Sequence, residues 1–186
     1  MQNFTRRAFT LSALAGASVT AACGNGLNSQ GGETIDARVD STLNQLYSDY
    51  PNTRDLANRS AGMLVMPLMT EVGFGIGGGY GRGALRINGA TSDYYSSAKG
   101  SFGLQFGAQQ YAHVLFFMTE AALDDFRRST GWVAGADIEY VVADVGQNAS
   151  ADTTTALSPV IAVVFGKAGL HVGATLEGKK YTRIIP

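Results

Sequence analysis

The stretch VGFGIGGGYGRGALRI, residues 72–87, decides how this chain folds. Six of its glycines occupy every second position, at Gly73, Gly75, Gly77, Gly79, Gly81 and Gly83. Alternate residues of a β-strand lie on the same face, so a strand here would have one face without side chains. Glycine destabilises a strand by roughly 0.5–1 kcal/mol per site relative to alanine. We therefore expect either that something packs directly on this bare face, or that the strand coils sharply, as at a barrel corner.

The same stretch also contains the pattern G-x-G-x-x-G, through Gly73, Gly75 and Gly78. In dinucleotide-binding proteins this pattern must open a helix, whereas here the alternation continues into residues 84–87, so we reject a dinucleotide site. A related unit begins at positions 73, 103, 131 and 169: glycine, a large apolar residue, two further residues, glycine, then glycine or alanine. Either strands resemble one another by chance, or a strand unit repeats with its glycines aligned across a strongly curved sheet.

Most of the remaining chain alternates with period two, which predicts strands. The predicted strands lie near 72–87, 91–97, 101–118, 132–145, 158–165 and 169–177, and Met63–Met66 forms a further buried strand that ends at Pro67. A hairpin turn at 166–169 joins the last two strands, and the polar run 147–156 is a solvated loop. Strands spaced this closely, without crossover helices, predict an antiparallel sheet.

Three helices complete the predicted fold. Apolar residues recur at helical spacing from Ile35 to Tyr50, and Pro51 ends that helix. Asn52 or Thr53 caps a second, short helix that reaches about Ser60. A third helix runs from about Glu120 to Arg128, with Thr119 as its N-cap. We therefore predict an α+β fold: a strongly curved, glycine-rich antiparallel sheet or partial barrel, with two N-terminal helices and one short inserted helix.

The N-terminus has the features of an export signal. Two arginines precede a weakly apolar stretch, residues 8–22, that is too short and too polar to span a bilayer. The run Thr5-Arg6-Arg7-Ala8-Phe9 resembles the twin-arginine signal, and an ordinary secretory signal with a chance arginine pair is the alternative. We expect residues 1–22 to be removed on export.

Cys23 is the only cysteine and directly follows this signal, as in a bacterial lipobox, whose cysteine becomes acylated. The alternative is a plain cleavage site with an incidental thiol. We expect a lipid attached to Cys23, a flexible tether over 23–33 and one domain over 34–186. Because Gly24 follows the cysteine, the anchor is expected on the periplasmic side of the cell envelope, in the outer membrane.

Charge excludes a nucleic-acid-binding function based on a global basic field. The chain of 186 residues has a formal net charge of −1, with 14 basic and 15 acidic residues. Two of the basic residues, Arg6 and Arg7, lie in the signal, which leaves 12 basic against 15 acidic residues, or −3, in the exported part. Any attraction to a membrane must therefore be local or hydrophobic.

Nothing in the sequence points to catalysis. The two histidines, His113 and His171, lie in apolar alternating segments and are interpreted as structural. Asp137 and Glu139 share a strand face, which suits either paired carboxylates or the solvent face of an amphipathic strand. Two histidines without a spaced cysteine or acidic partner make a poor metal site. We expect no enzyme activity, no cofactor and no metal.

Four motifs, in this order, resemble the SYLF family, a lipid- and actin-associated domain first known from eukaryotic membrane-trafficking proteins. They are AGMLVMP (61–67), VGFGIGGGYGRG (72–83), GLQFGAQ (103–109) and LEG (176–178). The resemblance covers roughly Ala57 to Arg183. It implies binding of phosphoinositides or other anionic lipids, without known catalytic residues. Eukaryotic members are thought to use a basic amphipathic N-terminal helix, whereas the helix predicted here over 35–50 is nearly neutral.

The predicted function is that of an envelope lipoprotein that binds a lipid or membrane surface. The basic residues expected to meet lipid headgroups are Arg54, Arg59, Arg82, Arg86, Lys179 and Lys180. The alternative is an anchored structural or protein-interaction module without specific lipid binding. Co-sedimentation of the delipidated protein with liposomes distinguishes the two.

Overall fold

The computed structural model describes residues 30–135, 139–142, 158–168, 176 and 178–186. The helices are α2 (Gly31–Asp49), α3 (Thr53–Arg59) and α4 (Glu120–Arg128). The strands are β1 (Gly62–Ile87), β2 (Ala90–Phe117), β3 (Trp132–Val133), β4 (Glu139–Val142), β5 (Val160–Ala168) and β6 (Lys180–Ile184). Predictions for residues 1–29, the loop 147–156, His171, Asp137 and, apart from Leu176, the strand 169–177 lie outside the described residues. The predicted strand 132–145 is not continuous, because Ala134 and Gly135 lie outside both β3 and β4.

One long hairpin, β1 with β2, dominates the molecule. The two strands pair antiparallel from Gly62 opposite Phe117 to Ile87 opposite Ala90. Asn88 and Gly89, both with positive φ, form the tight turn between them, as the right-handed twist of a two-residue hairpin requires. The predicted strands 91–97 and 101–118 are therefore one strand.

The prediction that a strand ends at Pro67 is wrong. Strand β1 passes through this proline, and the register shifts between Met66 and Met69, which marks a bulge. Proline cannot donate a backbone hydrogen bond, and a bulge is one of the places where a strand tolerates it.

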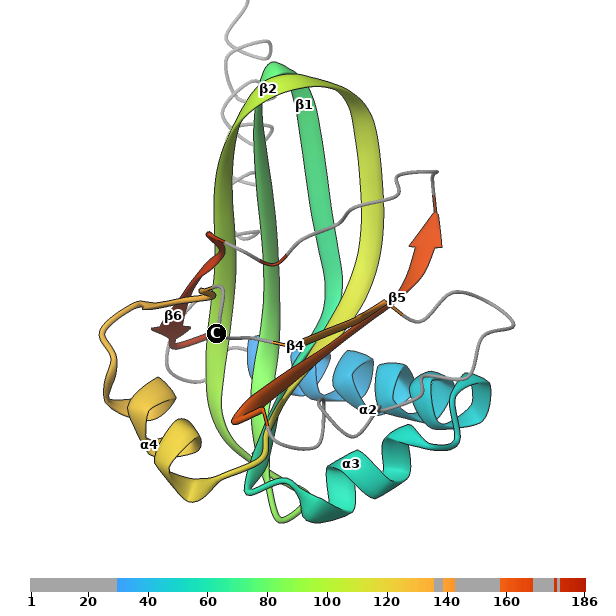
Figure 1. Cartoon of the computed structure of the whole chain (residues 1–186), viewed down its shortest axis with the longest axis vertical. Coiled ribbons are helices and arrows are strands. Elements are labelled where there is room, and N and C mark those ends of the chain that lie inside the picture. Colours follow the sequence, from blue (N-terminus) through green and yellow to red (C-terminus); the bar gives the residue numbers. More distant parts are fainter. Residues whose placement is uncertain (1–29, 136–138, 143–157, 169–175, 177) are drawn as a thin grey trace, which may run out of the picture.

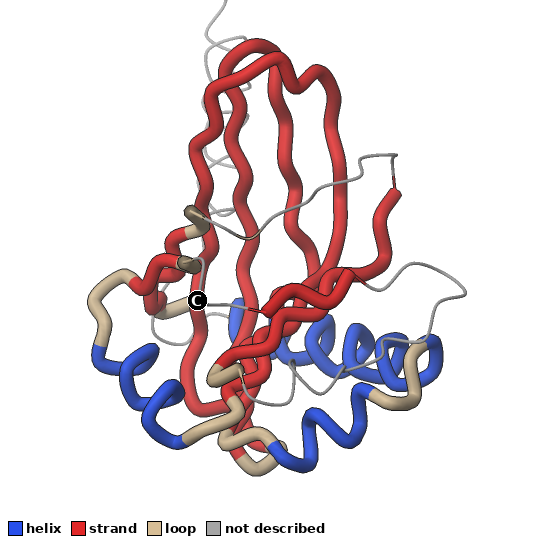
Figure 2. The backbone as a smooth tube through the Cα atoms, in the orientation of Figure 1, coloured by secondary structure: helices blue, strands red, loops and turns tan. Residues whose placement is uncertain are grey.

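The hairpin is folded over on itself. Figures 1 and 2 show β1 and β2 arching at one end, so that each strand runs up one side of the molecule and down the other. A second register shift, between Phe74 and Ile76, lies in the glycine-rich stretch. The outer edge of β2 then pairs with β6 in its first half and with β5 in its second half. The predicted α+β fold with a strongly curved sheet is confirmed.

Two details of the sheet differ from the prediction. Strand β4 pairs parallel to β5, whereas the other described pairs are antiparallel. The hairpin turn predicted at 166–169 is wrong for 166–168, because β5 continues to Ala168. Gly166, with a φ of +68°, is accommodated inside the strand.

Both faces of the central strands are buried. On β5, Val160, Ala162 and Val164 face the inside of the curled sheet, whereas Ile161 and Val163 face the side covered by α2 and α3. The inner cluster contains the largest aromatic side chains, and the outer one receives Ile35, Val39 and Leu46 from α2. A strand buried on both faces is therefore apolar throughout.

The helices lie close to their predicted positions. The hydroxyl of Thr119 accepts a hydrogen bond from the backbone N–H of Ala122 (3.2 Å), which caps α4. Helix α2 begins at Gly31, three residues before the predicted start of the domain. Asp36 fixes α2 to the sheet by accepting hydrogen bonds from Thr91 (2.7 Å) and Tyr94 (2.8 Å). No helix in the described part of the chain is long and apolar enough to span a membrane.

Candidate functional site

The bare face of the glycine stretch is covered by the first half of the same strand. A Cβ added at Gly81 would lie 2.6 Å from the carbonyl oxygen of Leu68, and one at Gly79 would lie 2.7 Å from Cγ of Glu71. At Gly83 it would overlap the carbonyl oxygen of Val65. Real Cβ atoms do not approach so closely, so backbone oxygens require glycine at Gly81 and Gly83, whereas at Gly79 the side chain of Glu71 would have to move. Here the fold combines the two explanations: the strand bends, and its own first half packs on the bare backbone.

Glu71, which Gly79 accommodates, is the centre of a polar cluster inside the curled sheet. It forms an ion pair with Lys179, whose side chain is fully buried. Its carboxylate also accepts hydrogen bonds from the hydroxyl of Tyr111 (2.5 Å) and from the side-chain amide of Gln109 (2.6 Å). Three donors on one carboxylate join β1, β2 and the segment before β6.

The ionisation of this cluster favours a structural role. Burial alone would raise the pKa of Glu71, but the hydrogen bonds from Lys179, Tyr111 and Gln109 and the charge of Lys179 together lower it. Burial also lowers the pKa of Lys179, against the opposing effect of Glu71. Burial and the hydrogen bond to Glu71 raise the pKa of Tyr111, so its hydroxyl remains protonated. Glu71 stays a carboxylate and Tyr111 stays a donor.

His113 lies beside this cluster and is fully buried. Its Nε2 is 2.8 Å from the hydroxyl of Tyr181. Burial, with a smaller contribution from the charge of Lys179, lowers the pKa of His113 well below 6.5, so the ring is neutral at physiological pH. The interpretation of His113 as structural agrees with this placement. Among the described residues, no group of three or more His, Cys, Asp or Glu side chains could hold a metal ion.

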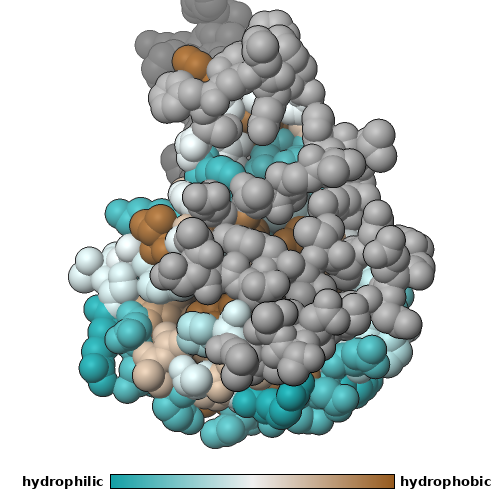
Figure 3. Space-filling model, in the orientation of Figure 1, coloured by the Kyte–Doolittle hydropathy of each residue, from teal (hydrophilic) through white to brown (hydrophobic). Residues whose placement is uncertain are grey.

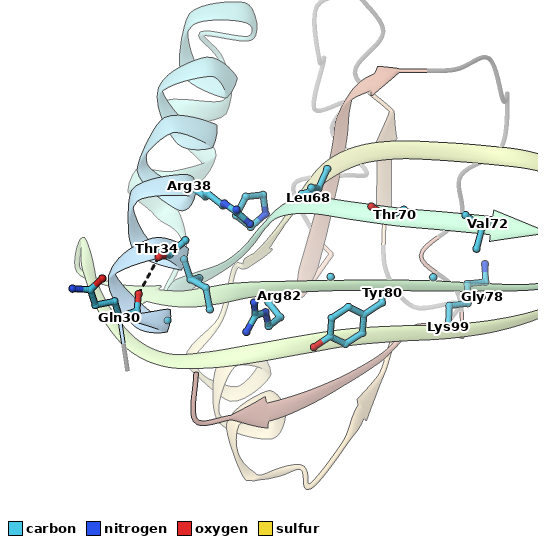
Figure 4. Close-up of a pocket in the computed structure, with 15 residues that line it drawn as sticks. Gln30, Thr34, Arg38, Leu68, Thr70, Val72, Gly78, Tyr80, Arg82 and Lys99 are labelled. Carbon is cyan, nitrogen blue, oxygen red and sulfur yellow. Dashed lines mark hydrogen bonds between the residues drawn. The ribbon is translucent and has the colours of Figure 1, made fainter. Parts of the chain in front are cut away.

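A groove lies on the opposite side of β1, where the start of α2 meets both halves of the strand (Figure 4). Its volume is about 880 Å³, within the range of small-molecule sites. Figure 4 shows Leu68, Thr70 and Val72 on one run of β1, and Tyr80 and Arg82 on the other. Alternation along the strand explains this arrangement, because Met69 and Glu71 point to the inside and their neighbours point to the groove.

The groove combines exposed apolar side chains with positive charge. Leu68, Val72 and Tyr80 are 42%, 57% and 55% exposed, and Ile76, further along the same strand, is 71% exposed. Arg38 from α2, Arg82 from β1 and Lys99 from β2 supply the basic groups. None of the described residues that line the groove is acidic.

The structure brings only one of the six predicted basic residues to this groove, namely Arg82. Arg54 and Arg59 are exposed on α3; in Figure 3 hydrophilic side chains gather along the lower rim of the molecule, where α3 lies. Arg54 stacks over the ring of Tyr47 at 4.8 Å. Lys180 is exposed at the start of β6.

Two of the predicted lipid-binding residues are contradicted by the structure. Lys179 is fully buried and paired with Glu71, so it cannot reach a headgroup. The side chain of Arg86 is 12% exposed and its guanidinium lies 2.7 Å from Asp40 and 3.5 Å from Asp36, so α2 already neutralises it.

Arg38 and Lys99 line the groove but were not predicted to bind lipid. Lys99 could have been found from the hairpin register, because it lies opposite Gly79 in the glycine stretch. No local sequence pattern could have placed Arg38 at the groove, because its position depends on how α2 packs on the sheet.

The curled sheet, the closed polar cluster and the open groove belong to a domain of the α+β class. A model of the family described as Ysc84, Las17-binding protein actin regulator, matches residues 98–183. This match agrees with the SYLF resemblance and covers residues 98–183 of the chain. The family is one of binding domains and not a known class of enzymes. No curated protein matches the chain.

Proposed function

We propose that this chain is an exported, lipid-anchored protein that binds an anionic lipid surface through its groove and catalyses no reaction. The observation that supports this most directly is the composition of the groove, in which Arg38, Arg82 and Lys99 lie among exposed apolar side chains. A lipid surface presents the same two chemistries, negative headgroups above apolar chains. The family match supports a lipid-binding or actin-regulator-related module.

Local charge must provide the attraction, because the exported part carries −3 overall. Charges separated by more than about 8 Å are screened at physiological salt, so only basic groups close to the membrane contribute. Each such group contributes about 1 kcal/mol at an anionic surface. Insertion of Tyr80 or Val72 adds a hydrophobic contribution that salt does not weaken.

The anchor is proposed from the sequence motif at Cys23. Acylation there would hold the protein on the periplasmic side of the envelope, at the outer membrane. Cys23→Ser should move the protein to the soluble fraction, and mass spectrometry of the wild-type protein should show acyl chains on Cys23. An unmodified mature protein would contradict the anchor but leave the groove proposal standing.

A second candidate function is protein binding, which the matched family favours because it is described as a Las17-binding protein actin regulator. Under this alternative the anchor only places the domain, and the groove receives a protein segment. The two candidates predict different results when the protein without its acyl chains is mixed with vesicles made of lipid alone. A lipid-binding groove binds such vesicles, and a protein-binding groove does not.

Co-sedimentation of the Cys23→Ser protein with vesicles tests the proposal. We expect binding to phosphatidylglycerol-containing vesicles, weaker binding to pure phosphatidylcholine, and loss of the difference at high salt. Replacing Arg82 and Lys99 with Gln should weaken binding by about 2 kcal/mol at most. The matched control, Arg54→Gln with Arg59→Gln, removes the same charge from α3 and should bind normally. Absence of binding to both vesicle types would favour the protein-binding candidate.

A further inference from the structure

The groove lies where the described chain begins. Gln30 and Gly31 line one end of it, at the first turn of α2. Figure 4 shows Gln30 and Thr34 at that end, with Val72, Gly78 and Lys99 toward the other. A membrane anchor attached just before Gln30 would therefore lie close to this end of the groove.

The connection from Cys23 to this end of the groove is short. Seven residue steps separate Cys23 from Gln30, and even a fully extended chain covers at most about 3.6 Å per residue, or roughly 25 Å in total. A lipid on Cys23 would thus keep the Gln30 end of the groove within roughly 25 Å of the membrane that holds it. Linkage this short raises the effective concentration of the two partners into the millimolar range.

The opposite end of α2 is much further away. A helix of 19 residues is about 28 Å long, and α3, with Arg54 and Arg59, follows that distant end. Anchoring near Gln30 therefore favours contact through Arg38 and Arg82 and disfavours contact through the basic residues of α3.

We infer that the groove engages the same membrane that anchors the protein, so that each molecule is attached to one leaflet at two points, the lipid on Cys23 and the groove. This inference rests on the proposed function and adds the orientation of the domain. It excludes a role in which the anchored protein reaches out to bridge a second membrane through this groove. It also explains how a weak site can keep the groove on the membrane. At a millimolar effective concentration, a site with a Kd of about 0.1 mM would be bound about ten times as often as unbound.

The single thiol makes the inference testable whether or not cells acylate it. The chain that begins at Cys23 keeps every described residue and is coupled through that thiol to a maleimide lipid in vesicles. Hydrogen exchange is then compared between vesicles of phosphatidylcholine alone and vesicles that also contain phosphatidylglycerol. We expect about tenfold slower exchange over residues 68–82 on the anionic vesicles, with no change over 53–59. Arg82→Gln with Lys99→Gln should remove the protection, and Arg54→Gln with Arg59→Gln should keep it.

A second measurement detects the opposite orientation. Coupled vesicles are mixed with a second, uncoupled anionic population, and clustering is followed by energy transfer between labelled lipids. Clustering, or protection over 53–59 instead of 68–82, would overturn the inference. If the Cys23→Ser protein binds these vesicles but the coupled protein shows no protection over 68–82, only the inference fails. If the Cys23→Ser protein does not bind at all, the proposed function fails and the inference falls with it.

Discussion

On one side of β1, Met69, Glu71 and the glycines at 79, 81 and 83 are packed against other parts of the chain; on the other side, Val72, Ile76 and Tyr80 are exposed. The two sides belong to the same strand and alternate residue by residue. The comparison teaches that the bare glycine face serves folding and that the large side chains opposite it are available for binding. Substitutions on the two sides should therefore change different properties.

The largest effect is expected from Lys179→Met. This change leaves the carboxylate of Glu71 inside the sheet without its cation, and breaking a buried ion pair from one side typically costs 3–5 kcal/mol. Tyr111 and Gln109 still donate hydrogen bonds to Glu71. We therefore expect the free energy of unfolding, measured in urea, to fall by about 3 kcal/mol, near the lower end of that range.

The neighbouring Lys180→Met is the matched control, since Lys180 is exposed. It should change the free energy of unfolding by no more than about 0.5 kcal/mol. The double variant Lys179→Met with Glu71→Met should be less destabilised than Lys179→Met alone, because it removes the unpaired charge. Equal, small effects at 179 and 180 would mean that the buried ion pair does not form.

The next largest effect is expected at Gly83. Its Cβ would overlap the backbone oxygen of Val65, and overpacking typically costs 1–3 kcal/mol. We expect Gly83→Ala to lower the free energy of unfolding by about 2–3 kcal/mol, measured by thermal or urea unfolding. Gly78→Ala, whose Cβ would have an ordinary 3.6 Å contact, should stay within about 0.5 kcal/mol of wild type. If both variants melted alike, the two halves of β1 would not pack as described.

A pH-dependent loss of stability should come from His113. Its pKa in the folded state lies well below 6.5, so at lower pH the unfolded chain binds a proton that the folded protein does not. Stability from this residue is therefore complete above pH 6.5 and falls as the pH drops below it. The fall can be no steeper than one proton allows, about 1.4 kcal/mol per pH unit. His113→Gln should flatten this part of the profile; an unchanged slope would assign it to other groups.

Local sequence signals predicted the helices and the alternating stretches that form β1 and β2, because spacing, Pro51 and the Thr119 cap act over a few residues. They could not predict partners set by the folding over of the hairpin. Glu71 and Lys179 are 108 residues apart, and nothing local marks Lys179 as different from Lys180. Arg86 was misassigned for the same reason, since its carboxylate partners lie on α2. The glycine alternation indicated that something packs there, but not that the strand packs on itself.

The smallest effect on stability, and the clearest separation of the two sides, is expected from Ile76→Ser combined with Tyr80→Ser. Both side chains are more than half exposed, so they gain little from folding, and the free energy of unfolding should change by no more than about 0.5 kcal/mol. Membrane insertion would bury them, and full burial of such a side chain is worth about 1.5–3 kcal/mol. Vesicle binding should therefore weaken by at least about tenfold, equally at low and high salt, unlike the loss expected for Arg82→Gln with Lys99→Gln. Urea unfolding and co-sedimentation of the same preparation measure both quantities. A variant that lost stability but bound vesicles normally would show that this side of β1 serves folding as the glycine side does, and the distinction between the two sides would disappear.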